Sequence, residues 1–274
     1  MTSAMTERIV ERGDVCLAVA EEGPADGIPV VLLHGLTATR RYVVMGSRTL
    51  ERGGHRVIAY DTRGHGGSSP APSYRYEDLA GDLLAVMDAC GVERAVLAGA
   101  SMGAHTLLRV ALDAPERVRG VVAITPAFEP GAPADLARWD NLADGLRSGG
   151  IEGFVAAYRV EEEVPDGWQE TVRTVLRQRM AQHEHLDAVA DALEQVPRSQ
   201  PLASLDELRA LSVPALVVAS RDEADPGHPL AVGEAYAAAI PGARLLVEPE
   251  GRSPLAWQGG QLSRAIAELA AEAR

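Results

Sequence analysis

Short runs of apolar residues alternate with longer amphipathic stretches along most of the chain. Aliphatic side chains dominate the runs at 30–33, 57–60, 95–98, 121–124, 216–219 and 245–247. Runs of this length and composition are typical of strands buried on both faces of a parallel sheet. A further run at 15–20 alternates less cleanly, which favours an antiparallel edge strand.

The stretches between these runs carry apolar residues every third or fourth position. Tyr76, Leu79, Leu83 and Met87 follow this spacing, which is typical of an amphipathic helix. Helices are therefore predicted over 76–90, 102–112, 230–240 and 261–273. Repeated alternation of strands and helices predicts an α/β fold with a mostly parallel central sheet and helices on both faces.

The alternation of predicted strands and helices is interrupted between residues 128 and 211. This segment begins rich in proline and glycine and then shows only helical spacing, for example at Trp168, Val172 and Leu176. We interpret 128–211 as a helical lid inserted into one core made of residues 1–127 and 212–274. Such a lid is expected to cover the C-terminal edge of the sheet, where open α/β sheets bind ligands.

Composition narrows the classes of partner. The 274 residues carry a formal net charge of −13, which disfavours nucleic acid and anionic membrane surfaces. No run of eighteen apolar residues is present to span a bilayer, and residues 1–14 lack the apolar stretch of a signal peptide. We expect a cytoplasmic protein that acts on a small-molecule substrate or ligand; the oligomeric state is not indicated.

The first chemistry-bearing motif is Gly99-Ala100-Ser101-Met102-Gly103, between a predicted strand and a predicted helix. Small residues on both sides of Ser101 allow the sharp turn of a nucleophile elbow, which presents the serine hydroxyl at the top of the sheet. A plain glycine-rich connection is the alternative.

A second motif, His34-Gly35-Leu36, follows another predicted strand. The backbone N–H groups of Leu36 and Met102 are expected to converge there as an oxyanion hole. The alternative is an ordinary turn in which His34 is structural.

With these motifs the chain resembles the α/β-hydrolase superfamily over nearly its whole length. The resemblance also rests on Asp61-x-Arg63-Gly64-His65-Gly66-x-Ser68 and on Ala111-Leu112-x-x-x-Pro115-Glu116-Arg117-Val118. The chain looks most similar to the group that includes 3-oxoadipate enol-lactonases and cofactor-free haloperoxidases. The resemblance implies a serine–acid–histidine site under a helical lid, with no cofactor and no metal.

The resemblance places the acid after the strand at 216–219, where two residues compete. Asp222 lies three residues beyond the strand, and Asp225 better matches the spacing to the next helix. The more rigid position at the strand end favours Asp222, and the other carboxylate then lies near a helix N-terminus.

The histidine of the resemblance should follow the last strand, but Arg252 stands at that position. An arginine cannot accept a proton from a serine near neutral pH. His228, in the loop that carries the acid, is the first substitute, followed by His183 and His185 in the lid. Arg252 itself either clamps an anionic group of the substrate, pairs with Asp222 or points to solvent.

These residues favour a cofactor-free enzyme that acts on a small ester, lactone or related carbonyl compound. Trp139, Tyr158 and Trp168 are expected either to line the substrate pocket or to form the core of the lid. The alternatives are a lyase or isomerase that uses Ser101 and Arg252, and a catalytically inactive protein that binds a small ligand.

Overall fold

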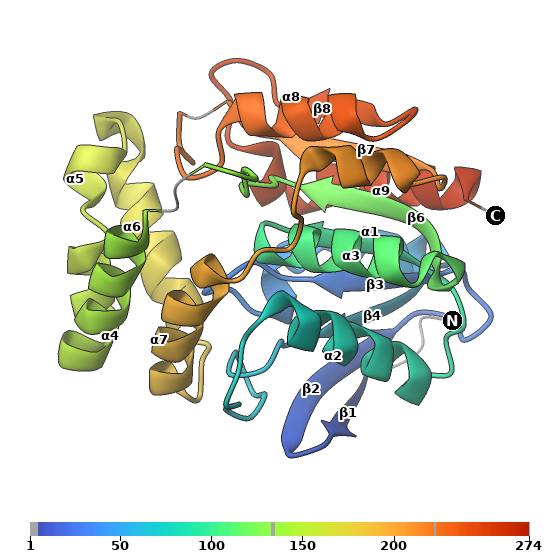
Figure 1. Ribbon diagram of the computed structural model, residues 1–274, viewed down its shortest axis with the longest axis horizontal. Helices are drawn as coiled ribbons and strands as arrows, with labels where there is room; N and C mark the ends of the chain where they lie inside the picture. Colours follow the sequence, from blue (N-terminus) through green and yellow to red (C-terminus); the bar gives the residue numbers. More distant parts are fainter. Residues whose placement is uncertain (1–4, 133–134, 222, 274) are drawn as a thin grey trace.

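A computed structural model describes residues 5–132, 135–221 and 223–273 of the protein. Within them, eight strands form one sheet in the order β1-β2-β4-β3-β5-β6-β7-β8 (Figure 1). β1 pairs antiparallel with β2, β2 pairs antiparallel with β4, and all the later pairs are parallel. The strands are β1 (Thr6–Arg12), β2 (Val15–Glu22), β3 (Pro29–Leu33), β4 (Arg56–Tyr60), β5 (Ala95–Ala100), β6 (Val118–Ile124), β7 (Ala215–Ala219) and β8 (Arg244–Val247).

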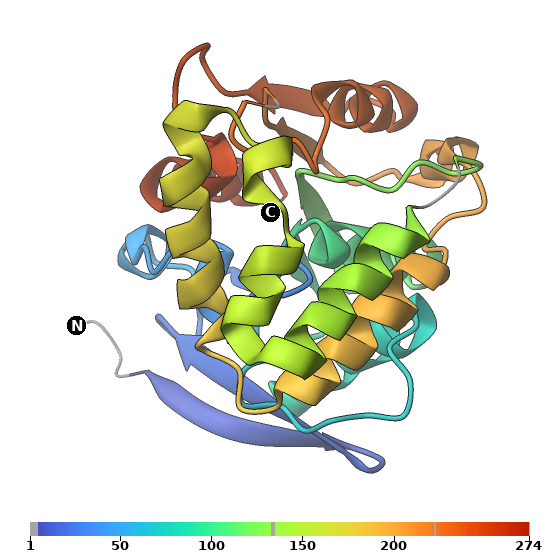
Figure 2. The same cartoon turned by 90° about the vertical axis from the view of Figure 1, so that its left-hand side faces the viewer.

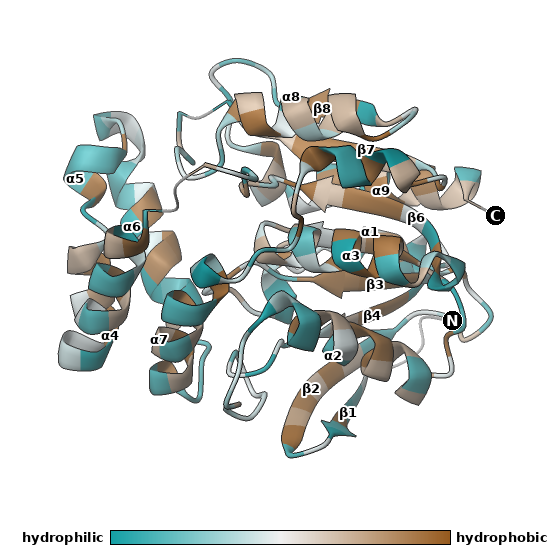
Figure 3. Cartoon of the chain, viewed as in Figure 1, coloured by the Kyte–Doolittle hydropathy of each residue, from teal (hydrophilic) through white to brown (hydrophobic). Residues whose placement is uncertain are grey.

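Helices cover both faces of this sheet. On one face lie α2 (Tyr76–Ala89), α3 (Met102–Asp113) and α8 (Leu230–Ala239), whose apolar sides join the larger core cluster. On the other face lie the short α1 (Thr49–Arg52) and α9 (Gly259–Glu272), with a second cluster beneath them. The inner strands are mostly apolar and the outward helix faces are largely polar (Figure 3), as burial of both faces of the inner sheet requires. The fold is thus the predicted α/β class.

Among the described residues between β6 and β7, four α-helices form a separate layer at one end of the sheet (Figures 1 and 2). They are α4 (Leu136–Ala157), α5 (Val160–Glu163), α6 (Asp166–Met180) and α7 (Leu186–Gln195), and they share their own apolar cluster. The chain then returns to the core, where Leu202, Leu208 and Leu211 pack beneath the sheet. Shorter 3-10 helices are η1 (Arg40–Tyr42), η2 (Pro115–Arg117), η3 (Val196–Arg198), η4 (Leu205–Ala210) and η5 (Leu255–Trp257).

Two strands at the sheet edges differ from the sequence-based expectation. The edge strand is β1, which lies outside β2 and has only Val10 buried, so it carries no apolar run for a sequence pattern to detect. β8 forms the opposite edge, and its Leu245 and Leu246 are exposed rather than buried on both faces. Among the helices that the structure describes, none is both long and apolar enough to cross a bilayer.

The turn after β4 is held by a buried ion pair. Arg63 donates from Nε to Asp82 Oδ2 at 2.7 Å and from Nη2 to Oδ1 at 2.8 Å, and both side chains are almost fully buried. This bidentate pair ties the Asp61-Ser68 segment to α2, and Ser68 bonds the backbone of β2. These contacts anchor the segment to the core on both of its sides.

Candidate active site

Ser101 lies at a sharp turn between β5 and α3, at the C-terminal edge of the sheet. Its backbone has φ 50° and ψ −113°, a strained combination for a residue other than glycine. A Cβ on Gly99 would lie 2.6 Å from the backbone of Gly103, and one on Gly103 would lie 2.4 Å from the Leu33 oxygen. The two glycines therefore allow the close approach of strand and helix that a nucleophile elbow needs.

The loop after β3 forms a tight turn beside this serine. Ala38 N–H donates to Gly35 O at 3.0 Å, and Thr37, the third residue of the turn, has φ 66°. In the described part of the chain, the backbone N–H groups of Leu36 and Met102 donate to no other group. Two unpartnered donors on adjacent loops are the arrangement expected of an oxyanion hole.

Three side chains fix the left-handed Thr37, and two of them come from the lid. Arg179 of α6 donates from Nη2 to Leu36 O at 3.2 Å and to Thr37 Oγ1. His183 accepts from Gly66 N–H at Nδ1 and therefore donates from Nε2 to Thr37 O at 3.1 Å. His65 Nε2 accepts from Thr37 N–H at 3.4 Å. The geometry of the turn at Leu36 and Thr37 thus depends on the position of the inserted helices.

Asp225 and His228 form a hydrogen-bonded pair in the loop after β7. Their Oδ1 and Nδ1 atoms are 2.7 Å apart, and both side chains are mostly buried. Burial alone would raise the pKa of Asp225, but the charge and hydrogen bond of His228, with the charges of Arg179 and Arg138, hold it below its ordinary value. The ionised carboxylate accepts the Nδ1–H of His228. Asp222, the favoured acid from sequence, lies outside the described residues.

A cavity of about 180 Å³ brings these parts together, which is smaller than the roughly 300–1,000 Å³ of typical ligand pockets. Its walls come from the loops after β3, β5, β6 and β7 and from the lid. Of the residues predicted for the site, those that line it are Ser101, Leu36, Asp225, His228, Trp139 and Tyr158. Ser101 and the Asp225–His228 pair therefore face one enclosed space.

Other candidate residues lie elsewhere. Arg252 is exposed and does not line the cavity. Trp168 packs within the lid cluster with its ring 6.4 Å from that of Trp257. His185 is exposed on the lid, whereas His183 is buried and both its ring nitrogens are bonded.

His34 has a structural environment. Its Nε2 accepts from Thr62 N–H at 2.9 Å, and its Nδ1 lies 2.8 Å from Gly35 O. Burial, which outweighs the bond to Gly35, lowers the pKa of His34 to about 3. The ring is therefore neutral, and both nitrogens are occupied by the backbone. This agrees with the structural alternative for His34.

Sequence reasoning missed the two arginines of the cavity wall, Arg138 and Arg179. A signal for Arg179 exists: with Val172 and Leu176 it stands at the i, i+4 and i+7 positions of one helix stripe. A charged residue on an otherwise buried stripe indicates either a buried ion pair or a ligand site.

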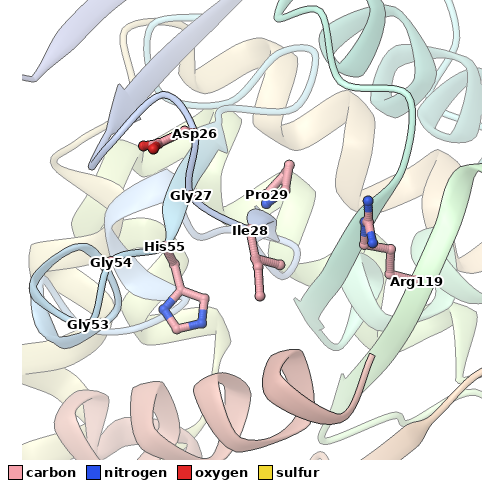
Figure 4. Close-up of a pocket in the computed structure, with 8 residues that line it drawn as sticks. All are labelled: Asp26, Gly27, Ile28, Pro29, Gly53, Gly54, His55 and Arg119. Atoms are coloured by element: carbon pink, nitrogen blue, oxygen red, sulfur yellow. The ribbon is translucent and has the colours of Figure 1, made fainter. Parts of the chain in front are cut away.

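A second hollow lies at the opposite end of the sheet, around the start of β3 (Figure 4). His55 and Arg119 lie on either side of Ile28 there, and this hollow contains no serine, threonine or cysteine nucleophile. Within residues 5–132, 135–221 and 223–273, no cluster of histidine, cysteine and carboxylate side chains is suited to hold a metal ion.

Comparison with known proteins agrees with this architecture. The chain is 36% identical over 133 residues to epoxide hydrolase B of Mycobacterium tuberculosis, which covers 44% of this chain and 37% of that protein. It is 27% identical over 214 residues to 3-oxoadipate enol-lactonase 2 of Acinetobacter baylyi, 77% of each chain. The enol-lactonase structure from Burkholderia xenovorans superimposes with a TM-score of 0.72 at 25% identity, covering 97% and 98% of the two chains.

Apart from the enol-lactonase, the first curated relatives match over less than half of their own length, between 33% and 48%. The family assignment rests on a broader match. The family model for the alpha/beta hydrolase fold covers residues 28–259, which includes the sheet from β3 to β8, the elbow and the lid. The chain therefore belongs to the α/β-hydrolase fold family.

Proposed function

We propose that the protein is a serine hydrolase of small esters or lactones, with Ser101 as the nucleophile, His228 as the general base and Asp225 as the acid. The observation that carries the proposal is the 2.7 Å Asp225–His228 hydrogen bond in the wall of the cavity that Ser101 also lines. A serine hydroxyl is a weak nucleophile at neutral pH and needs an adjacent base.

His228 is the histidine of this cavity that suits that role. His34 is the other histidine in its wall, and the backbone occupies both its ring nitrogens. In His228, Nδ1–H donates to Asp225, so Nε2 of the neutral ring is the acceptor. Within the described residues, nothing donates to that Nε2. The carboxylate thus fixes the tautomer that leaves a basic nitrogen available.

In the proposed reaction, Nε2 takes the proton of the Ser101 hydroxyl as Oγ bonds to the substrate carbonyl carbon. The N–H groups of Leu36 and Met102 stabilise the oxyanion, each such donor contributing about 3–4 kcal/mol in characterised enzymes. The protonated His228 then gives its proton to the departing alkoxide. Water, activated by the same nitrogen, hydrolyses the acyl-serine and releases the acid.

The choice of ester and lactone substrates rests on the relatives as well as on the site. The enol-lactonase relationship covers 77% of both chains. The shorter matches carry no substrate argument. The exposed Arg252 has no place in this mechanism, and neither does a lyase or isomerase step that depends on it.

A fluorophosphonate probe, read by intact mass, and turnover of p-nitrophenyl acetate test the proposal together. Wild-type protein should be labelled on Ser101 and should turn over the ester, and Ser101→Ala should lose both properties. His228→Ala should lower kcat by about 10³–10⁴-fold. His185→Ala, which removes an exposed lid histidine, is the matched control and should keep wild-type turnover. An unlabelled wild type, or a His228→Ala variant as active as the control, would refute the assignment.

A further inference from the structure

Arg179 is a mostly enclosed cation with no ion pair. It extends from α6 into the cavity wall, and within the described residues no carboxylate lies within 4 Å of its guanidinium. The arginines on the outer surface of the same helix differ: Arg173 pairs with Glu161 and Arg177 with Glu152. Asp225 in the same wall interacts with the charge of Arg179 at longer range, but a guanidinium removed from water with no carboxylate in contact is costly to the folded protein. Its retention beside Ser101 therefore calls for a functional explanation.

The donors of Arg179 are only partly used. Nη2 donates to Leu36 O and to Thr37 Oγ1, which accounts for both its hydrogens. Nε is buried and has no partner in the described part of the chain. Nη1 also makes no hydrogen bond to a described residue. Three of the five N–H groups of this side chain thus remain available for a group that enters the cavity.

The charge of the cavity wall also favours an anion. The whole chain has a formal net charge of −13, yet the described wall contains two arginines and a single carboxylate, Asp225. Asp225 is already bonded to His228. Arg138 is partly compensated, because Glu163 lies 3.4 Å from it and the Tyr158 ring lies beneath its guanidinium. Arg179 therefore provides the positive charge of the wall that no described carboxylate contacts.

We infer that the cavity binds esters or lactones that carry a carboxylate, and that Arg179 binds this carboxylate. The inference rests on the proposed function and adds the substrate class. Arg179 Nη2 is 3.2 Å from the carbonyl oxygen of Leu36, the residue whose N–H faces the proposed oxyanion. The substrate carboxylate therefore lies within a few bonds of the scissile carbonyl. The planar guanidinium matches a carboxylate in shape as well as in charge.

Binding to a protein that cannot turn over substrate tests the inference apart from catalysis. The Ser101→Ala protein is titrated calorimetrically with monomethyl glutarate and with methyl 4-carbamoylbutanoate, which has a neutral amide in place of the carboxylate. We expect the anion to bind at least about tenfold more tightly, as a charge-assisted hydrogen bond predicts. Adding Arg179→Met should bring the two affinities to within about threefold. Adding Arg177→Met, on the outer side of the same helix, should preserve the preference.

The ratio of the two affinities separates binding from a merely structural role. If Arg179 only holds the Leu36 turn, its loss weakens both ligands equally and leaves the ratio unchanged, which would overturn the inference. Equal affinities in Ser101→Ala, or no binding of monomethyl glutarate at millimolar concentration, would also overturn it. This comparison needs no Arg179 variant, so it decides whether the cavity prefers the anion even where Arg179→Met fails to fold. Arg179→Lys, which keeps the charge, then replaces Arg179→Met, and an unchanged ratio of affinities together with its loss in Arg138→Met would overturn the role of Arg179.

The outcomes also distinguish this inference from the proposed function. Turnover of p-nitrophenyl acetate by the wild type, with equal binding of the two ligands, would refute the anion site alone. A clear preference for the anion without labelling or turnover would refute the hydrolase proposal alone.

Discussion

His105 should make the protein less stable in mild acid by an amount that can be measured. Its Nε2 accepts from the N–H groups of Ala127 and Phe128, both at 3.2 Å, and its Nδ1 lies 3.1 Å from the hydroxyl of Tyr76. The side chain is 4% exposed. Burial, and then the nearby charge of His228, lowers the pKa of His105 from 6.5 to about 3. Protonation at Nε2 would also remove the acceptor for two buried N–H groups.

The sign and size of the effect follow from this pKa. In the unfolded chain His105 binds a proton below pH 6.5, whereas in the folded chain it does so only near pH 3. The free energy of unfolding therefore has its full value above pH 6.5 and decreases as the pH falls from 6.5 towards 3. Between pH 7 and pH 5 the loss from this one residue is about 2 kcal/mol, at about 1.4 kcal/mol per pH unit.

His105→Gln isolates this contribution, because its side-chain oxygen can still accept from the backbone but does not titrate. The free energy of unfolding is measured by urea denaturation at pH 7 and pH 5. The decrease between the two pH values should be about 2 kcal/mol smaller in the variant than in the wild type. His185→Gln, at an exposed histidine, should show the wild-type decrease. Equal decreases in His105→Gln and the wild type would refute a neutral buried His105.

Three further changes test the site and its scaffold. Asp225→Asn should lower kcat for p-nitrophenyl acetate by about 10³–10⁴-fold, because an amide does not hold the required tautomer of the base. Asp222→Asn should change kcat by less than about threefold. Equal losses in the two variants would contradict the proposal that Asp225 is the acid. Gly103→Ala should lower the free energy of unfolding by about 1–3 kcal/mol or more, since the Cβ of the alanine would lie 2.4 Å from the backbone oxygen of Leu33. An unchanged urea midpoint would contradict this, because it would show that the turn tolerates a side chain there. Asp82→Ala should cost about 3–5 kcal/mol in the same assay, because the buried Arg63 would lose its bidentate partner and keep the more distant carboxylate of Asp78 at 3.6 Å. A cost below about 1 kcal/mol would mean that Asp78 or water replaces the lost pair.

The core of the sheet was predictable because a strand buried on both faces is a continuous run of apolar residues in the sequence. The strands β3 to β7 are short aliphatic runs, and the length and composition of the runs locate them. Edge strands do not follow this rule. β1 has six of its seven residues at least partly accessible, and the aliphatic Leu245 and Leu246 of β8 give the pattern of a buried strand although they are exposed at the edge.

The sequence could point to residues of the candidate site only where local chain geometry defines their positions. The turn around Ser101 is encoded by its neighbouring glycines, and the donors at Leu36 and Met102 follow from the ends of adjacent strands. The role of Arg179 is not local, since 142 residues separate it from the Thr37 hydroxyl that it contacts. The spacing of residues in the sequence does not predict this contact, because the contact depends on how the lid is placed over the sheet.

The position of Arg252 does not exclude an active serine, because the parallel sheet offers a second place for a base. β7 and β8 are hydrogen-bonded neighbours, with Ala219 opposite Val247, and neighbouring strands lie about 4.8 Å apart. The loops that follow them start from almost the same point of the sheet edge, so a histidine on either loop can reach one cavity. The loop after β7 carries both Asp225 and His228, already hydrogen-bonded to each other. An acid and a base on one loop keep their mutual geometry whatever residue follows β8, which is why we assign the base to His228 and leave Arg252 out of the mechanism.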